Sequence, residues 1–439
     1  MARKRADQGR LMALCPDKHE NPASFARCRT CGLPLIDLKQ EFSLIAERLG
    51  RTANLARPKA SRVLAGVGSF GVNLVQLHQA SLVRSAPGRG LSVLYVDAGA
   101  TMGNGAAPGT FRLQLGGAAS GSATFCGVAE EAAMGDPSLV PLLKNAGLRE
   151  SDEEQTVFVA TALGGGTGSG VTPVLLQNAL ALNPANRAFV LGMLPSADEL
   201  FHARLNASYG LSRLVSDGDR GPVAEAIVTV QYDRLKRVRG VGKGGEELKS
   251  ESVLATTFDM LSTAFSFPNS VKVARLNRAA HTQVLTPCVA LGRSMEIFGS
   301  LGNVLESAVA FPLAAVSNGE VLSCYLMLRV PQGLAKEFPD DIVGEELGGL
   351  IRRHLPAARY SLYVTTYWDD ASDRVDACLL LGGEAWRVLH SIPDRLQQFN
   401  AESAKVKDWS VFGLSRERVS TMVRTLQEYD ARLEEMRRF

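Results

Sequence analysis

The sequence has no hydrophobic run that approaches the length of a membrane span. Its basic N-terminus, MARKRADQGR, is not followed by the apolar core of a signal peptide. Neither sign of charge dominates, since 48 Lys and Arg residues stand against 45 Asp and Glu residues, and a net charge of +3 does not by itself indicate a nucleic-acid partner. We therefore expect a cytoplasmic protein, and its 439 residues exceed the length that one hydrophobic core serves.

Cysteine is scarce, and its count of 7 is odd. Only Cys15, Cys28 and Cys31 are clustered. The others are scattered through apolar surroundings, where buried thiols are a better expectation than disulfide partners: Cys126, Cys288, Cys324 and Cys378.

The clustered cysteines lie in residues 15–35, where Cys15 and His19 form one pair of candidate ligands and Cys28 and Cys31 form a second. Two such pairs, each closed by a short turn, suit a tetrahedral zinc site. We predict a zinc ribbon that holds a structural Zn²⁺ and binds a protein partner. The alternative is a disordered tail with incidental cysteines.

Residues 1–14 form a basic tail. Arg3, Lys4, Arg5 and Arg10 are candidates for contact with nucleic acid or anionic lipid, and a solvated tail is the alternative.

The most informative stretch is GGGTGSG, which follows the strand-like run Val157 to Leu163 and precedes the helix-compatible VTPVLLQNAL. A side-chain-free turn between a strand and a helix aims several backbone N–H groups at one point, and the helix N-terminus adds partial positive charge. The pattern therefore predicts a phosphate-binding turn rather than a flexible glycine loop. Its residues are Gly164, Gly165, Gly166, Thr167, Gly168, Ser169 and Gly170.

A second glycine turn stands in VLAGVGSFGVNLVQL, residues 63–77, where Gly66, Gly68 and Gly71 separate a short strand from a helix. Asp97 ends the next strand, LSVLYVD. This combination also opens Rossmann domains, so a nicotinamide or flavin enzyme is one interpretation. That interpretation leaves GGGTGSG without a role.

Both turns resemble the nucleotide loops of the tubulin/FtsZ family, whose signature is GGGTGSG or GGGTGTG and whose first loop is GVGGxGGNA. GVGSFGVNL places Asn73 on the asparagine of that loop, and VDAGA, residues 96–100, is similar to the family segment TDAQA. The resemblance implies GTP or GDP as the ligand, with Mg²⁺ as a further cofactor. The contacts that it implies in the first loop and the following strand are Gly66, Gly68, Ser69, Phe70, Gly71, Asn73 and Asp97.

Other positions carry over less completely. Glu199 stands where the family has a ribose-contacting acid, and Arg204 lies one place from the family's arginine. Tyr232 replaces the asparagine that reads guanine, and the second base contact falls near Phe258 or Asp259. Because Tyr and Phe offer a stacking face rather than a paired donor and acceptor, the resemblance implies phosphate binding more firmly than guanine specificity.

The family's hydrolysis loop, NxDxxD, inserts its acids into the neighbouring subunit's nucleotide pocket. The residues that align with it here are KVARLN, with Lys272, Ala274 and Asn277 at the asparagine and the two acids. The chain has no Asp or Glu between Asp259 and Glu296. We therefore expect either slow hydrolysis of GTP or an acidic loop supplied by a related subunit, and a non-hydrolysing scaffold recruited through the zinc ribbon is an alternative.

We predict an α/β fold of tubulin/FtsZ type, with a mostly parallel sheet, a long central helix, a smaller α/β second domain and an N-terminal zinc ribbon. Residues 36–58 are expected to form a helix and a linker, 59–246 the GTP-binding domain, 247–268 the central helix, 269–385 the second domain and 386–439 C-terminal helices. The last of these carries an apolar stripe from Val419 to Leu433, which indicates a helix packed on the body or a coiled coil.

Overall fold

A computed structural model describes residues 12–14, 20–22, 62–85, 91–98, 109–115, 124–148, 154–196, 199–216, 221–235, 237, 240–241, 247–266, 268–368, 372–383, 405–406 and 408–438. The predicted zinc ligands Cys15, His19, Cys28 and Cys31 lie outside these residues, as does the basic tail up to Arg10. Two short strands between them, β1 (Met12–Leu14) and β2 (Glu20–Pro22), pair antiparallel. Among the described residues no helix is long and apolar enough to cross a membrane.

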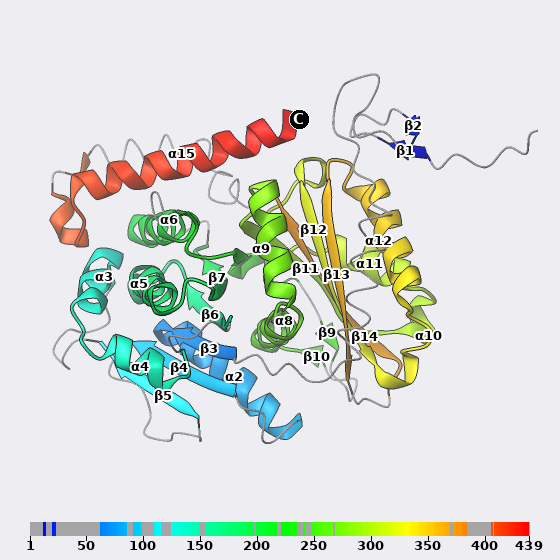
Figure 1. Ribbon diagram of the computed structural model, residues 1–439, viewed down its shortest axis with the longest axis horizontal. Helices are drawn as coiled ribbons and strands as arrows, with labels where there is room; N and C mark the ends of the chain where they lie inside the picture. The colour runs from blue at the N-terminus through cyan, green and yellow to red at the C-terminus, as the bar shows by residue number, and fades with distance from the viewer. Residues whose placement is uncertain are drawn as a thin grey trace, which may run out of the picture.

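A sheet of ten strands in the order β13-β12-β14-β11-β8-β7-β6-β3-β4-β5 runs through the molecule (Figure 1). Its first half is entirely parallel. The strands of this half are β3 (Arg62–Val67), β4 (Leu91–Asp97), β5 (Thr110–Gln114), β6 (Thr156–Ala162), β7 (Arg187–Leu194) and β8 (Ala226–Gln231). Most of them are continuous apolar runs because helices cover both faces of a parallel sheet.

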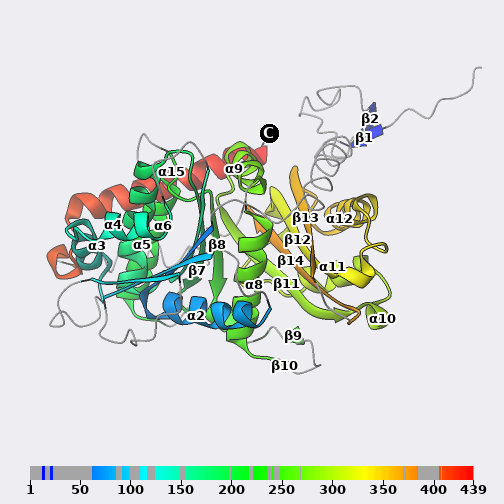
Figure 2. The same cartoon turned by 60° about the horizontal axis from the view of Figure 1, so that its bottom comes forward.

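Two apolar cores lie on the two faces of this half. Along β6, Val157 and Val159 enter one core and Phe158 and Ala160 enter the other. The first core includes α3 (Cys126–Met134), α4 (Leu139–Asn145), α5 (Gly166–Leu182), α6 (Phe201–Val215) and α15 (Arg416–Arg438). The second includes α2 (Gly68–Ser85), α8 (Ser250–Ala264) and α9 (Asn269–Ala280), and Figure 2 shows α2 and α15 on opposite sides of the strands.

The second half of the sheet is mixed. It contains β11 (Val284–Ser294), β12 (Ser323–Pro331), β13 (Tyr360–Trp368) and β14 (Arg374–Gly382). β14 pairs antiparallel with β11 and β12, whereas β12 and β13 are parallel. Helices α10 (Met295–Phe298), α11 (Leu301–Val309) and α12 (Asp340–His354) pack with their own core on one face, and α8 packs on the other, between the two halves.

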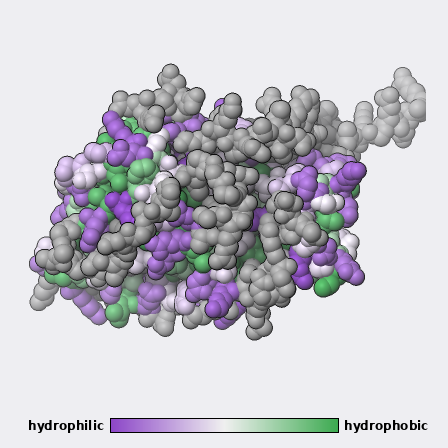
Figure 3. Space-filling model, turned by 90° about the horizontal axis from the view of Figure 1, so that it is seen from below, coloured by the Kyte–Doolittle hydropathy of each residue, from purple (hydrophilic) through white to green (hydrophobic). Residues whose placement is uncertain are grey.

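Short elements complete the described chain. They are α7 (Tyr232–Leu235), the strand pair β9 (Gly240–Val241) and β10 (Glu247–Leu248), and the 3-10 turns η2 (Asn318–Glu320), η3 (Gln332–Leu334) and η4 (Trp409–Phe412). The coloured part of the face in Figure 3 mixes hydrophilic and hydrophobic residues, and the most exposed large apolar side chains, Leu200 and Ile297, belong to different halves of the chain.

The C-terminal helix α15 packs on the body. Val419, Met422, Leu426, Tyr429 and Leu433 follow one another at helical spacing, and all five are buried in the first core. Of the two alternatives for this apolar stripe, the structure therefore has the packed helix.

Candidate functional site

The order of the strands places a switch point between β3 and β6. The chain passes from β3 outward to β4 and β5, and then crosses to β6 on the other side of β3. At such a point the connections after two neighbouring parallel strands leave on opposite faces, and ligands bind in the crevice that opens at the carboxyl ends of the strands. The connections here are the two glycine turns, which lead into α2 and α5.

The two turns lie against each other. Gly68 has a φ of 71°, a left-handed conformation that favours glycine, and a β-carbon added to it would lie 3.5 Å from the Gly168 nitrogen. The first amides of α5, from Gly166 to Gly168, have no acceptor within their own helix. Two helix N-termini thus face one place at the carboxyl edge of the sheet, which is an arrangement suited to an anion.

Close backbone contacts fix the turns. A β-carbon at Gly71 would come within 2.0 Å of the Ala160 carbonyl oxygen on β6. One at Gly168 would come within 2.2 Å of the Ala162 carbonyl oxygen. Glycine at these positions therefore lets α2 and α5 start in direct contact with the sheet.

Asp97 lies beside the first turn, at the carboxyl end of β4. Its carboxylate accepts hydrogen bonds from the Ser69 hydroxyl at 2.9 Å and from the Ala98 amide at 2.8 Å, and the residue is buried. Each carboxylate oxygen of Asp97 thus accepts a hydrogen bond from the protein, which fixes the orientation of the side chain. Asn73 is exposed and Phe70 half-buried on the first turns of α2.

Similar folds occur among solved structures. CetZ2 of Haloferax volcanii, solved as a GTPγS-bound protofilament, superposes with a TM-score of 0.58 and 18% identity over 79% of this chain and 100% of that one. The chain has the tubulin/FtsZ fold. An empty FtsZ dimer of M. jannaschii gives a TM-score of 0.57 at 18% identity over 78% and 93% of the two chains, and CetZ of Methanosaeta thermophila gives 0.59 at 15% over 86% and 99%.

Sequence comparison gives a shorter match. CetZ2 of Haloferax volcanii is 41% identical over 88 residues, which are 20% of this chain and 22% of that protein, so the chain matches only about a fifth of this relative's length. No family model matches the chain. The tubulin/FtsZ fold, which the resemblance of the two glycine turns implied, is confirmed. In this fold both turns lie at the same end of the sheet, whereas the dinucleotide-enzyme interpretation gave GGGTGSG no role.

In this fold the remaining predicted contacts lie at the same carboxyl edge. Glu199 follows β7 and is exposed, with its carboxylate accepting the Ser196 amide at 2.9 Å. Arg204 is partly buried on the second turn of α6. Tyr232 directly follows β8 and is 42% exposed.

Two predicted contacts are buried in the protein. The Ser169 side chain is fully buried and its hydroxyl donates to the Leu163 carbonyl, so it braces the turn instead of facing a ligand. Phe258 is also fully buried on α8, edge-on to His78 with ring centroids 5.6 Å apart. The Phe258 side chain therefore belongs to the second core, and no part of its ring is exposed to a base.

The predicted hydrolysis loop is also corrected. Lys272, Ala274 and Asn277 lie within helix α9 rather than in a loop, and Ala274 and Asn277 are buried. Asn277 donates to the Glu225 carbonyl at 2.7 Å and accepts from the Tyr325 hydroxyl at 2.7 Å. Only Lys272, on the first turn, is partly exposed. The lack of acids does not depend on the register of the alignment, since it covers the whole stretch between Asp259 and Glu296.

Helix α9 lies at the edge of the sheet opposite to the glycine turns. Glu225, whose carbonyl Asn277 contacts, directly precedes β8. Ser270 donates to Glu154, which precedes β6. Both partners therefore stand at the amino ends of their strands.

One residue of the site carries no motif in the sequence. Asn206 on α6 is almost fully buried, and its Nδ2 donates to the Gly164 carbonyl at 3.0 Å and to the Thr124 carbonyl at 2.8 Å. Its Oδ1 accepts the Cys126 amide at 3.0 Å. The only signal in the sequence is an amide placed between two apolar residues of a helix, and that signal is too common to identify a site.

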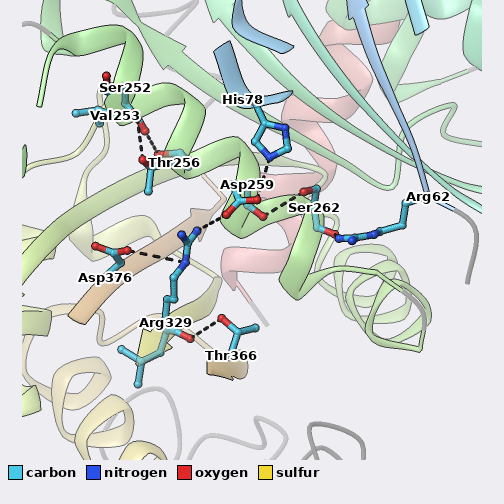
Figure 4. Close-up of polar contacts among 12 residues, drawn as sticks. Arg62, His78, Ser252, Val253, Thr256, Asp259, Ser262, Arg329, Thr366 and Asp376 are labelled. Atoms are coloured by element: carbon cyan, nitrogen blue, oxygen red, sulfur yellow. Dashed lines mark hydrogen bonds and ion pairs between the residues drawn. The ribbon is translucent and has the colours of Figure 1, made fainter. Parts of the chain in front are cut away.

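A polar cluster joins the two halves of the fold where α8 passes between them (Figure 4). Asp259 on α8 contacts His78 of α2 at 2.9 Å and Arg329 of β12 at 2.7 Å. Arg329 also lies 3.8 Å from Asp376 of β14. Burial acts to raise the pKa of the Asp259 carboxyl, but Arg329 and His78 overcome it and hold this pKa at about 2.

Proposed function

We propose that the chain binds a guanine nucleotide, GTP or GDP, between its two glycine turns and assembles head to tail into filaments. The observation that carries this proposal is the contact between Gly68 and the first turn of α5 at the switch point, where two helix N-termini meet. A protein of the same fold, CetZ2, has been solved as a GTPγS-bound protofilament, which supports both the ligand and the mode of assembly.

In the proposed complex the backbone does most of the binding. Amides of the turns at Gly68 to Gly71 and Gly166 to Gly168 hold the phosphates, and Asp97 directs the first turn through Ser69. Glu199 and Arg204 lie toward the ribose, Asn73 lies at the rim, and the exposed ring of Tyr232 stacks on the base. A stacking contact accepts any base, so we expect weaker discrimination against ATP than an asparagine would give.

We further propose that hydrolysis is slow. In head-to-tail stacking the amino edge of one subunit meets the nucleotide edge of the next. There α9 bears the cation Lys272 and has no Asp or Glu of its own, and the nearby Glu154 carboxylate is held by a hydrogen bond from Ser270. A positioned proton acceptor contributes about a hundredfold or more to such reactions. A cation beside the terminal phosphate also favours retention of the nucleotide by opposite charge.

A related subunit with an acidic loop would complete the site in trans. The alternative, a scaffold that neither hydrolyses nor polymerises, stays open for test. In either case the proposed zinc ribbon at Cys15, His19, Cys28 and Cys31 docks the protein partner. Among the described residues no group of three or more His, Cys, Asp or Glu side chains could hold a metal ion.

The test begins with the purified chain of 439 residues. Mass spectrometry of the released ligand should identify GTP or GDP, and elemental analysis should find one zinc per chain. Addition of GTPγS should move the protein into the pellet on centrifugation, whereas GDP should not. Release of a dinucleotide instead would refute the proposed ligand.

Phosphate release then separates the two parts of the proposal. With GTP at saturation, we expect assembly without a rise in turnover as protein concentration increases. Brisk turnover that grows with protein concentration would refute slow hydrolysis and leave nucleotide binding intact. GTP binding without any pelleting would favour the scaffold.

A further inference from the structure

Helix α3 is fastened to the second glycine turn. Asn206 accepts the Cys126 amide at the start of α3 and donates to the Gly164 carbonyl of GGGTGSG. A β-carbon at Gly170 would come within 2.1 Å of the Cys126 carbonyl oxygen, so α3 and the start of the second turn of α5 touch backbone to backbone. A shift of α3 would therefore displace the phosphate-binding turn.

The chain just before α15 packs on α3 in the same way. Gly413, with a φ of 65°, allows an approach so close that a β-carbon at Gly127 would meet the Gly413 carbonyl oxygen at 2.1 Å. The Phe412 ring lies edge-on to Phe125 with centroids 5.2 Å apart, and to Phe201 with centroids 6.1 Å apart. Phe125 and Phe201 belong to the segments that start α3 and α6. Phe412 therefore packs on both of the helices that the Asn206 hydrogen bond to Cys126 connects.

An ion pair adds a second attachment. Glu130 of α3 is buried, and Arg418 on the first turn of α15 reaches its Oε2 at 3.4 Å. Tyr209 and Arg213 of α6 contact the same carboxylate. The far end of α15 is attached elsewhere, since Arg437 donates to the Gly383 carbonyl at 2.6 Å and pairs with Glu320 at 3.4 Å, both in the second half of the fold. Figure 1 shows α15 running from the side of α3 toward that half.

We infer that the segment Trp409–Arg418 is a positioning element of the nucleotide site, which holds α3 and, through Asn206, the GGGTGSG turn in the geometry that binds phosphate. This inference rests on the proposed function. A turn held in its binding geometry loses less conformational freedom when the ligand arrives, so the C-terminal segment raises affinity without touching the nucleotide. By linkage, the nucleotide in turn strengthens the docking of this segment.

The test compares two arginines of the same helix. Equilibrium binding of GTPγS, followed by calorimetry, should be weakened about tenfold by Arg418→Ala and by Phe412→Ala, as expected for substitutions along a coupled contact chain. Arg418→Lys should restore most of the affinity, whereas Arg437→Ala should change it by less than about twofold. Glu130 keeps Tyr209 and Arg213 in the Arg418→Ala variant, so this variant is expected to fold.

Hydrogen exchange provides the second measurement. GTPγS should slow amide exchange in residues 409–418 of the wild-type chain and leave the last turn of α15 unchanged. Variants at Arg418 and Phe412 that bind GTPγS like the wild type would overturn the inference, as would an equal loss in Arg437→Ala, which would indicate general stabilisation by the helix. A wild-type chain that does not bind GTPγS would instead overturn the proposed function on which the inference rests.

Discussion

The two edges of the parallel sheet differ in what they offer to a nucleotide. The carboxyl edge has two glycine turns in contact and two helix N-termini that face one place. The amino edge has α9, whose first turn bears Lys272, in a stretch without any Asp or Glu. Binding by amides depends on how closely backbones pack, whereas hydrolysis depends on a single well-placed carboxylate. The two properties can therefore be present or absent separately, as they are here in our proposal.

The largest expected effect comes from a substitution that distorts the second glycine turn at the carboxyl edge. In Gly168→Ala the new methyl group would meet the Ala162 carbonyl oxygen at 2.2 Å and the Thr161 hydroxyl at 2.4 Å, and neither partner is the free end of a flexible side chain. The turn must then move out of its binding geometry, at a cost of about 3 kcal/mol, the upper part of the range for overpacking. We expect no measurable binding of GTPγS by calorimetry.

The matched control is Gly319→Ala. A β-carbon at Gly319 has no heavy atom within 4 Å, and the residue does not need a left-handed backbone, so binding and thermal stability should stay at wild-type values. If Gly168→Ala also binds GTPγS normally, the phosphate does not lie on the first turn of α5, and the carboxyl edge loses its proposed advantage over the amino edge.

The second effect comes from adding a carboxylate to helix α9, whose own sequence has none. Lys272→Asp places a carboxylate on the first turn of α9 at a partly exposed position, and we expect GTP turnover in assembled protein to rise by about a hundredfold, the lower end for a positioned proton acceptor. Arg275→Asp, one turn further along the same helix and exposed, makes the same change of charge and should leave turnover unchanged. A phosphate-release assay on pelleted filaments compares them, and equal rates in both variants would place α9 away from the neighbour's nucleotide.

The sequence predicted the carboxyl edge more reliably than the amino edge. Glycine turns between apolar strands and helices have a local physical meaning, so tight turns at Gly66, Gly68 and Gly168 could be predicted from the residue pattern. The fold was predicted from the resemblance of both turns to the tubulin/FtsZ family. Burial in a helix depends on partners that are distant in sequence. The placement of Asn277 against Glu225 and Tyr325 could not be predicted for that reason, and an aligned loop turned out to be a helix.

The same limit explains why the burial of Phe258 and Ser169 was not predicted and why Asn206 was omitted. Phe258 and Ser169 have residue types that suit a ligand. Only the tertiary structure reveals that Phe258 packs against His78 and that the Ser169 hydroxyl donates to the Leu163 carbonyl. Asn206 joins segments that are far apart in the chain. Local pattern thus identifies turns, whereas the residues that brace them require the tertiary structure.

The smallest of the three effects concerns the polar cluster around Asp259, which joins the two halves of the fold. Arg329→Met removes the main partner of Asp259, and we expect the free energy of unfolding near neutral pH to fall by about 2 kcal/mol, less than for a fully buried pair because His78 remains. Urea unfolding measures this difference. Arg353→Met breaks the exposed pair with Glu306 by the same substitution and should cost less than about 1 kcal/mol.

The pH dependence of the free energy of unfolding tests whether the charge of Asp259 is the cause of this loss. The pKa of Asp259 falls from an ordinary 3.8 to about 2 in the folded chain, so its stabilising contribution is complete above the ordinary value and disappears as pH falls from there toward about 2. Asp259→Asn and Arg329→Met should both lose less stability than the wild type across this acid range. An unchanged acid profile in both variants would show that the contact between the two halves of the fold does not depend on this charge and rests on the apolar packing of α8 instead.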